Sequence, residues 1–318
     1  MIRVVAFASA FLLAASPPAT SSESVLSPNE IVATASDTEW VTIAPDTLVV
    51  MDLVPGLEGK RRRIIIQLMP QPFSQGWVSN IRTLIAARWY DGTSINRVQD
   101  NYVVQWGDAT EKKSLPNGVA TIGQSEYVAS RTSAAPCGSD VADPGLCNGV
   151  SERLLSNGPG RDVYGNAGFW DGWPVSRYNG DDVWPVHCYA MVGVGRGMPP
   201  DTGTGAELYT VIGHAPRHLD RNIALVGRVI EGIEHLSSLP RGTGPLGFYE
   251  AATERTVIAS IRMGNAIAGL PRFEYLSTES ATFAGYAEAR ANRRDAFFIQ
   301  PALGADICNV PVPIRRAP

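Results

Sequence analysis

The chain has 318 residues, enough for one large domain or two ordinary ones. Hydrophobic residues make up 44% and charged residues 18%, which argues against a disordered or coiled-coil chain and allows a full core. The net charge of -4 leaves no electrostatic footprint for nucleic acid, so no nucleic-acid partner is expected.

The first residues have the pattern of a targeting segment. Arg3 precedes an apolar run over residues 4–15, and small residues and prolines follow over 16–21. This order is typical of a secretory signal, so we expect a signal peptide over 1–21 and a periplasmic or secreted mature protein. An uncleaved N-terminal anchor is the alternative. No other stretch approaches the roughly 18 apolar residues of a membrane span, so we expect no stable membrane insertion after signal removal.

The remaining elements follow from composition and periodicity. Residues 22–45 are rich in Ser, Thr, Pro and Ala and are interpreted as a linker or N-terminal arm. Runs of β-branched and apolar residues between turns predict strands over 47–53, 63–69, 94–98, 102–106, 186–194, 208–212, 223–229 and 255–263. Helical spacing predicts helices over 73–88, 231–239 and 277–294, the last capped by Ser277. Periodicity is lost over about 110–186, which we interpret as a long insertion with its own packing.

Many short strands with few helices predict a mostly β protein. The 31 glycines and 23 prolines favour the same loop-rich architecture over a helical bundle. A closed or nearly closed antiparallel barrel would leave few strand edges exposed, and the strand count fits one.

The four cysteines are candidates for disulfides, because an exported chain folds in an oxidising compartment. Cys137 and Cys147 bracket a turn-rich segment, where a bridge would pin a loop that has little core of its own. Cys188 and Cys308 would then pair with each other or stay buried and free. Metal ligation is the competing interpretation because His187 adjoins Cys188, but the usual ligand spacings are missing and we predict no metal site.

One segment carries an unusual density of detail, residues 90–108. Arg97 lies within a β-branched strand, and Gln105 follows eight residues later across a turn, so both side chains can face one side of a strand pair. A solvated arginine on an exposed sheet face is the alternative. Neither a Gly-x-Ser-x-Gly motif nor a phosphate-binding glycine loop accompanies it.

This segment resembles the cyclophilin signature: Tyr-Asp-Gly-Thr at 90–93, the Arg-Val of 97–98, and Gln105 with Gly107-Asp108. Residues 205–211 are similar to the family's Gly-Ser-Gln-Phe-Phe-Ile segment, and 219–232 to its Leu-Asp…Val-Phe-Gly ending. The resemblance spans about 47–263. It implies a closed eight-stranded antiparallel β-barrel capped by two helices over 46–264, interrupted by the insertion at 110–186 and followed by a C-terminal extension at 265–318.

The resemblance implies a peptidyl-prolyl cis-trans isomerase that acts on X-Pro bonds of exported proteins and assists their folding. Its partners would be proline-containing polypeptides, and it would need no cofactor. Amide resonance sets a rotation barrier of about 18–20 kcal/mol. A guanidinium that hydrogen-bonds the proline nitrogen favours the twisted amide, and the rigid, permanently charged Arg suits this role better than Lys.

Carried over residue by residue, the family's catalytic Arg and Gln correspond to Arg97 and Gln105. Its substrate-binding positions correspond to Tyr102, Val103, Glu207, Tyr209, His218 and Leu219, although Tyr102 and Tyr209 could equally be barrel core. Six positions depart from the family's usual residues: Asn96, Trp106, Gly193, Glu207, His218 and Ile223. We therefore predict isomerase activity at a reduced level. The alternative is a catalytically weak barrel that binds proline-containing segments or a partner protein as a periplasmic chaperone.

Overall fold

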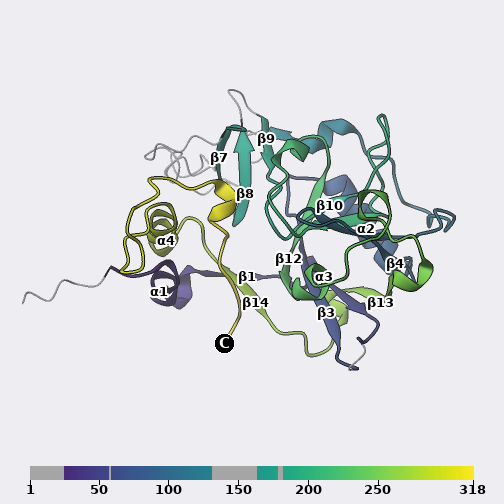
Figure 1. Ribbon diagram of the computed structural model, residues 1–318, viewed down its shortest axis with the longest axis horizontal. Helices are drawn as coiled ribbons and strands as arrows, with labels where there is room; N and C mark the ends of the chain where they lie inside the picture. The colour runs from purple at the N-terminus through teal and green to yellow at the C-terminus, as the bar shows by residue number, and fades with distance from the viewer. Residues whose placement is uncertain (1–24, 57–58, 131–162, 178–181) are drawn as a thin grey trace, which may run out of the picture.

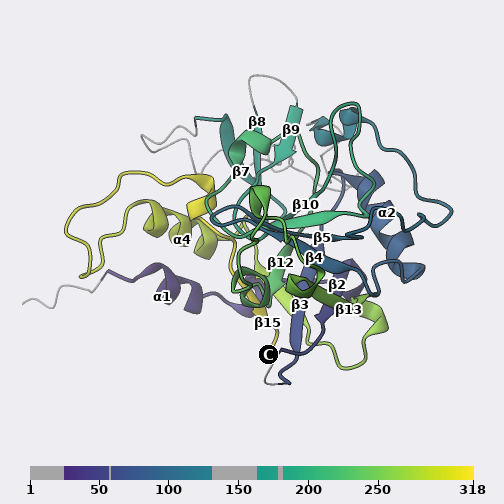
Figure 2. The same ribbon diagram turned by 45° about the vertical axis from the view of Figure 1, so that its right-hand side comes forward.

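The computed structural model describes residues 25–56, 59–130, 163–177 and 182–318. Figures 1 and 2 show two neighbouring parts: a barrel, and beside it a smaller unit in which α1 and α4 lie side by side. Within the described ranges, no helix has the length and apolar character needed to cross a membrane. Cys137 and Cys147, the candidate disulfide, lie outside these ranges.

Eight antiparallel strands close into the predicted barrel. Around the barrel they are β10 (Met191–Val194), β11 (Leu208–Val211), β5 (Val103–Gly107), β4 (Ser94–Val98), β13 (Thr256–Met263), β2 (Leu48–Leu53), β3 (Arg62–Leu68) and β12 (Leu225–Glu231). Alternate side chains fill the interior, among them Met51, Ile64 and Trp106, all fully buried. Closure pairs every strand on both sides, so the barrel needs no other element to cover an edge.

Two helices pack against the barrel. The helix α2 (Gln75–Ala86) contacts β12 and β13, and its apolar residues recur at helical spacing on one buried face that includes Trp77, Ile81 and Leu84. It begins later than residue 73 because Ser74 has a left-handed φ of 55°. The short helix α3 (Glu234–Ser237) contacts β3.

The segment expected to be a linker is structured over residues 28–43. It forms α1 (Pro28–Ala33), closed by a capping box between Ser27 and Glu30, and β1 (Trp40–Ile43). The strand β1 pairs with β14 (Phe273–Leu276) of the C-terminal extension, which also pairs with β15 (Ile314–Arg316). The partners of β1 lie more than 200 residues away in the chain, so local composition could not reveal this sheet.

The C-terminal extension also contains α4 (Ala281–Ala291), which packs against α1. The sequence predicted Ser277 as its cap, and this is wrong. Ser280 is the N-cap, and its Oγ accepts a hydrogen bond from the backbone N–H of Phe283 at 3.0 Å. Phe283 is fully buried and packs edge-on against Phe169 of the insertion, with ring centres 5.0 Å apart. The extension and the insertion therefore share a core.

The described part of the insertion forms a sheet that periodicity did not predict. Its four strands are β6 (Ala129–Ser130), β9 (Asp182–Pro185), β8 (Trp173–Arg177) and β7 (Asn166–Trp170). These strands are short and nearly continuously buried, with Trp170, Trp173 and Trp184 in the core, so they show no alternation of polar and apolar residues.

A buried arginine, Arg228, connects the barrel to the sheet of the insertion. Arg228 on β12 donates from Nε to Gln67 Oε1 at 2.9 Å and from Nη1 to the carbonyl oxygen of Gly172 at 2.6 Å. Its guanidinium lies 4.2 Å from the ring centre of Trp173. Burial lowers the pKa of Arg228 to about 9. The hydrogen bonds and the aromatic face offset part of the cost of removing this cation from water.

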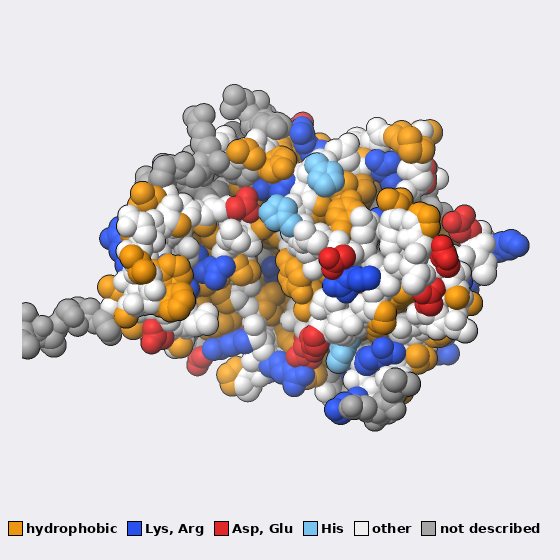
Figure 3. All heavy atoms as spheres, viewed as in Figure 1, with side chains coloured by type: hydrophobic (Ala, Val, Ile, Leu, Met, Phe, Trp, Pro, Cys, Tyr) orange, Lys and Arg blue, Asp and Glu red, His pale blue; other side chains and the backbone are white. Residues whose placement is uncertain are grey.

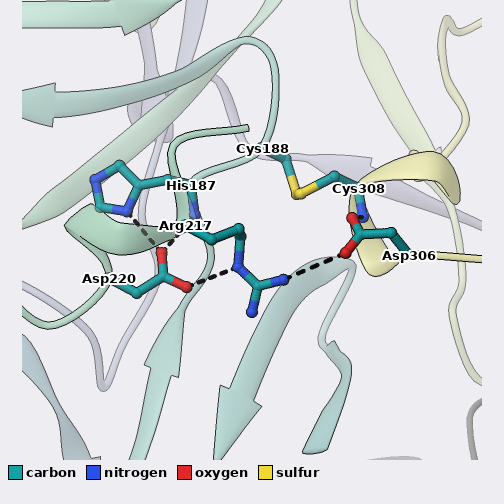
Figure 4. The surroundings of a disulfide bond; sticks show 6 residues. All are labelled: His187, Cys188, Arg217, Asp220, Asp306 and Cys308. Carbon is teal, nitrogen blue, oxygen red and sulfur yellow. Dashed lines mark hydrogen bonds and ion pairs between the residues drawn. A yellow bond between two sulfur atoms is a disulfide. The ribbon is translucent and has the colours of Figure 1, made fainter. Parts of the chain in front are cut away.

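Cys188 and Cys308 form a disulfide, which settles the pairing that the sequence left open. They are 120 residues apart and connect the segment before β10 to the C-terminal extension. The link stands beside a short 3₁₀ turn, Arg217–Leu219, that is also close to the extension (Figure 4).

Replacing both cysteines, as Cys188→Ser with Cys308→Ser, is expected to destabilise the extension by about 2–4 kcal/mol, because a long loop is no longer closed in the unfolded state. Hydrogen exchange should show faster opening of α4 and β14 than of β2 and β3, since the closed barrel keeps its own core. Equal acceleration throughout the described residues would contradict an extension that depends on the bridge more than the barrel does.

Candidate active site

Four neighbouring strands bring Arg97, Gln105, Tyr209 and Gly193 into one row. Arg97 on β4 is opposite Gln105 on β5, Gln105 is opposite Tyr209 on β11, and Tyr209 is opposite Gly193 on β10. Directly opposed residues share a face of the sheet. Because the alternate residues of β5 and β11 belong to the interior core, the row lies on the outer face of the barrel.

A β-bulge in β4 puts Arg97 on this face. The register shifts between Ile95, which is opposite Trp106, and Arg97, which is opposite Gln105. Regular alternation would place Ile95 and Arg97 on the same side, but Ile95 is fully buried in the barrel core. Asn96 is the extra residue, and its Nδ2 donates to the carbonyl oxygen of Gly107 at 3.1 Å. The bulge therefore turns Arg97 outward while Ile95 stays inside.

The guanidinium of Arg97 is fixed by three acceptors. Nη1 donates to Gln105 Oε1 at 2.9 Å, Nε donates to the carbonyl oxygen of Leu246 at 2.8 Å, and Nη2 donates to Gln99 Oε1. It also lies 5.6 Å from the ring centre of Tyr102. Partial burial lowers the pKa of Arg97, while negative charge on Glu207 opposes the shift. Arginine titrates so far above neutral pH that the group stays charged.

Gln105 connects Arg97 to an acidic group. Its Nε2 donates to Glu207 Oε1 at 2.7 Å while its Oε1 accepts from Arg97, so the two bonds fix which way the amide points. Burial raises the pKa of Glu207, and the hydrogen bond from Gln105 and the charge of Arg97 only partly offset this. A Cβ on Gly195 would come within 2.7 Å of Glu207 Cγ, so Gly195 makes room for this carboxyl side chain.

A pocket of about 90 Å³ lies on this row. Its lining residues are Arg97, Tyr102, Val103, Gln105, Val194, Gly195, Arg196, Tyr209, Leu219 and Ile223. The structure thus brings Arg97 and Gln105 together with four of the six expected substrate-binding residues, Tyr102, Val103, Tyr209 and Leu219. Glu207 contributes through Gln105. His218 is exposed and stacks on Tyr102, with ring centres 6.4 Å apart, so it lies one layer outside the lining.

Trp106, Gly193 and Ile223, three of the residues that depart from the family's usual ones, have different structural roles. Trp106 is fully buried in the barrel interior, on the opposite face of β5 from the pocket. Gly193 allows Tyr209 to lie flat on β10, because a Cβ at this position would come within 2.4 Å of the tyrosine ring. Ile223 lines the pocket and adds apolar surface.

Sequence reasoning missed residues behind and beside the pocket. Val194, Gly195 and Arg196 line it, but the glycine-dense run over 193–197 suggested only a dinucleotide-binding loop, which the lack of a following helix pattern argued against. His187 was noted only as a weak metal candidate, but its Nε2 lies 2.9 Å from Tyr209 Oη. The described residues include no group of acidic, Cys or His side chains arranged to hold a metal ion.

The pocket has the size and apolar lining to hold a small uncharged ring, and the guanidinium of Arg97 lies at its side. Val103, Leu219 and Ile223 supply apolar walls, and Arg97 supplies N–H donors at one side. Figure 3 shows acidic and basic side chains interspersed over the visible face.

Comparison with known proteins agrees with this geometry. The family model described as cyclophilin type peptidyl-prolyl cis-trans isomerase/CLD matches residues 57–263, more than half of the chain. A search of curated proteins gives no match. The crystal structure of cyclophilin AquaCyp293 from Hirschia baltica is 22% identical, covers 87% of this chain and 98% of its own, and superposes with a TM-score of 0.60.

A cyclophilin type isomerase from Cryptosporidium parvum is 13% identical, covers 68% of this chain and 97% of its own, and gives a TM-score of 0.35. The first of these structures shares the barrel and most of the additional length. With a closed barrel of the same kind and a family match from 57 to 263, the chain belongs to the cyclophilin-type peptidyl-prolyl cis-trans isomerase family.

Proposed function

We propose that the protein is a peptidyl-prolyl cis-trans isomerase that acts on X-Pro bonds of exported proteins. The observation that carries the proposal is the hydrogen bond between Arg97 and Gln105 across β4 and β5, at the edge of an apolar pocket. The family membership supports this reaction, and the contact between these two residues is consistent with it.

The free N–H groups of Arg97 support a role in donating a hydrogen bond to a substrate. A guanidinium has five N–H donors, and the hydrogen bonds to Gln105, Leu246 and Gln99 use three of them. Two donors remain for a prolyl residue seated in the pocket. A hydrogen bond to the proline nitrogen is strongest when the amide is twisted, because the lone pair is then released from resonance. The interaction therefore stabilises the transition state more than either planar isomer.

Two observations support substrates outside the cytoplasm. The Cys188–Cys308 disulfide is of a kind that persists mainly in oxidising compartments. The sequence of residues 1–21 has the order of a secretory signal. An assay of proline-peptide isomerisation on the mature protein tests the proposal directly. Peptide binding without turnover would instead favour the binding-module alternative.

Arg97→Ala and Arg97→Lys are both expected to lower kcat/KM by about a hundredfold, the size expected when a positioned donor to the transition state is lost. Lys retains the charge but not the planar fork that reaches Gln105 and the substrate together. Arg241→Ala, at an exposed arginine paired with Asp100, is the matched control. Turnover by Arg97→Lys at the wild-type rate in a coupled peptide assay would rule out this role.

Gly193→Ala is expected to raise KM by displacing the ring of Tyr209 into the pocket, because the added Cβ would stand 2.4 Å from that ring. Overpacking of this kind costs about 1–3 kcal/mol. Gly123→Ala, where the new Cβ meets only Ser125 Oγ at 3.5 Å, controls for loss of a glycine. An unchanged KM in Gly193→Ala, measured under the same conditions, would show that the close approach does not shape the pocket.

Glu207→Gln should stabilise the protein at neutral pH. Burial raises the pKa of Glu207 above its usual 4.5, so the folded state binds a proton more tightly than the unfolded chain. Wild-type stability therefore falls as pH rises from 4.5 through the raised pKa, and the advantage of the variant should vanish below pH 4.5.

Urea unfolding across that pH range measures this difference. Glu254→Gln is the control of opposite sign, since hydrogen bonds from Ala251 and Thr243 lower the pKa of the exposed Glu254. A stability difference between wild type and Glu207→Gln that does not change with pH would contradict the assignment.

A further inference from the structure

A series of hydrogen-bonded and ion-paired groups begins at the wall of the pocket, passes through the buried His187, Asp220 and Arg217, and ends at the exposed Asp306 of the C-terminal extension. Tyr209 Oη lies 2.9 Å from His187 Nε2, and His187 Nδ1 lies 2.8 Å from Asp220 Oδ1. Arg217 Nε donates to Asp220 Oδ2 at 2.8 Å, and Arg217 Nη1 lies 3.6 Å from Asp306 Oδ2. Figure 4 shows the part from His187 to Asp306, beside the Cys188–Cys308 disulfide.

The negative charge of Asp220 decides which groups in this series donate hydrogen bonds and which accept them. Burial acts to raise the pKa of Asp220, but hydrogen bonds from His187 and Arg217 outweigh it and keep the pKa below its usual value. Burial lowers the pKa of His187, so its ring is neutral at pH 7. Nδ1 therefore donates to the Asp220 carboxylate, and Nε2 accepts from the hydroxyl of Tyr209.

Water has little access to the bonds among Tyr209, His187 and Asp220, whereas the contact of Arg217 with Asp306 lies at the surface. His187 is 0% exposed, Tyr209 is 5% exposed and Asp220 is 6% exposed. On its other side, the Tyr209 ring rests on Gly193, which offers no side chain to hold it. The bond from its hydroxyl to His187 is therefore the polar contact that fixes the ring against the pocket.

We propose that His187 is a positioning residue for substrate binding, which holds Tyr209 in the pocket wall with the support of the C-terminal extension. The extension supports His187 by two routes. Asp306 contacts Arg217, which orders Asp220, and Cys308 is bonded to Cys188, the neighbour of His187. The kinetic measurements proposed below rest on the proposed isomerase function, whereas the measurements of peptide binding and of the Tyr209 ring do not.

The first experiment is a double-mutant cycle with His187→Phe, Tyr209→Phe and both together. If His187 acts through Tyr209, each single change should raise KM and the Kd for an Ala-Ala-Pro-Phe peptide by about three- to tenfold, the effect of one lost hydrogen bond. The double variant should be no weaker than the singles, because both remove the same bond. The value of kcat should stay within about twofold, since Arg97 and Gln105 are untouched. His235→Phe, at a half-exposed histidine outside the pocket lining, is the control.

A second readout reports the ring itself. In protein labelled with ¹³C-tyrosine, the Tyr209 signal is assigned by its loss in Tyr209→Phe and should move in His187→Phe. This measurement needs neither activity nor peptide binding. Tyr209→Phe removes a single oxygen atom, so it keeps the test valid if His187→Phe fails to fold. A wild-type protein that binds the peptide without isomerising it would refute the proposed function. The Kd values of the double-mutant cycle would still test the positioning role of His187.

The role of the extension is tested by Asp306→Ala against Arg316→Ala. Both residues bind the extension to the rest of the protein, but Arg316 pairs with Glu231, which does not line the pocket. Asp306→Ala should raise the peptide Kd by about twofold or more, and Arg316→Ala should leave it unchanged. An Asp306→Ala protein with wild-type affinity overturns the support by the extension. Additive effects in the cycle, or an unmoved Tyr209 signal in His187→Phe, overturn the positioning role.

Discussion

The pocket depends on the register of four strands, β4, β5, β11 and β10, which aligns Arg97, Gln105, Tyr209 and Gly193 across the outer face of the barrel. A shift of one residue in any of them would turn its member of the row into the barrel interior. Closure of the barrel fixes the register, and the bulge at Asn96 sets the side to which Arg97 points. The alignment of these four residues is therefore set by the pairing of the backbones.

Two polar side chains along this row, Tyr209 and Glu207, each have space and a hydrogen-bond partner supplied by neighbouring residues. A tyrosine at position 209 needs space for its ring and a partner for its hydroxyl, and Gly193 and His187 supply them. A carboxylate at position 207 needs space and a donor, which Gly195 and Gln105 supply. Random loss of function would not be expected to leave both Tyr209 and Glu207 with matched space and a matched bond. These contacts favour a reshaped site over a decaying one.

The sequence predicted what local patterns encode. Seven of the eight barrel strands fall close to the expected ranges, because each carries its own apolar pattern, while β10 occupies only the end of the run at 186–194. The sheet of β1, β14 and β15, the strands of the insertion and the partners of His187 depend on contacts between distant segments, which no local window contains. Arg97 and Gln105 were found through a motif, and the bulge that makes their geometry work was not.

The described C-terminal extension contacts residues that lie behind the pocket wall and does not contact the pocket directly. No residue of the described extension is among those that line the pocket, and Arg97 is held by groups on the barrel and by the turn at Pro245–Gly247. The extension instead reaches the segments that carry His187 and Asp220. The extension can therefore affect the pocket through Tyr209, which His187 contacts, and through Leu219, which lies in the Arg217–Leu219 turn. Arg97 and Gln105 are thus held within the barrel, whereas the pocket wall at Tyr209 and Leu219 is the part that the rest of the chain contacts.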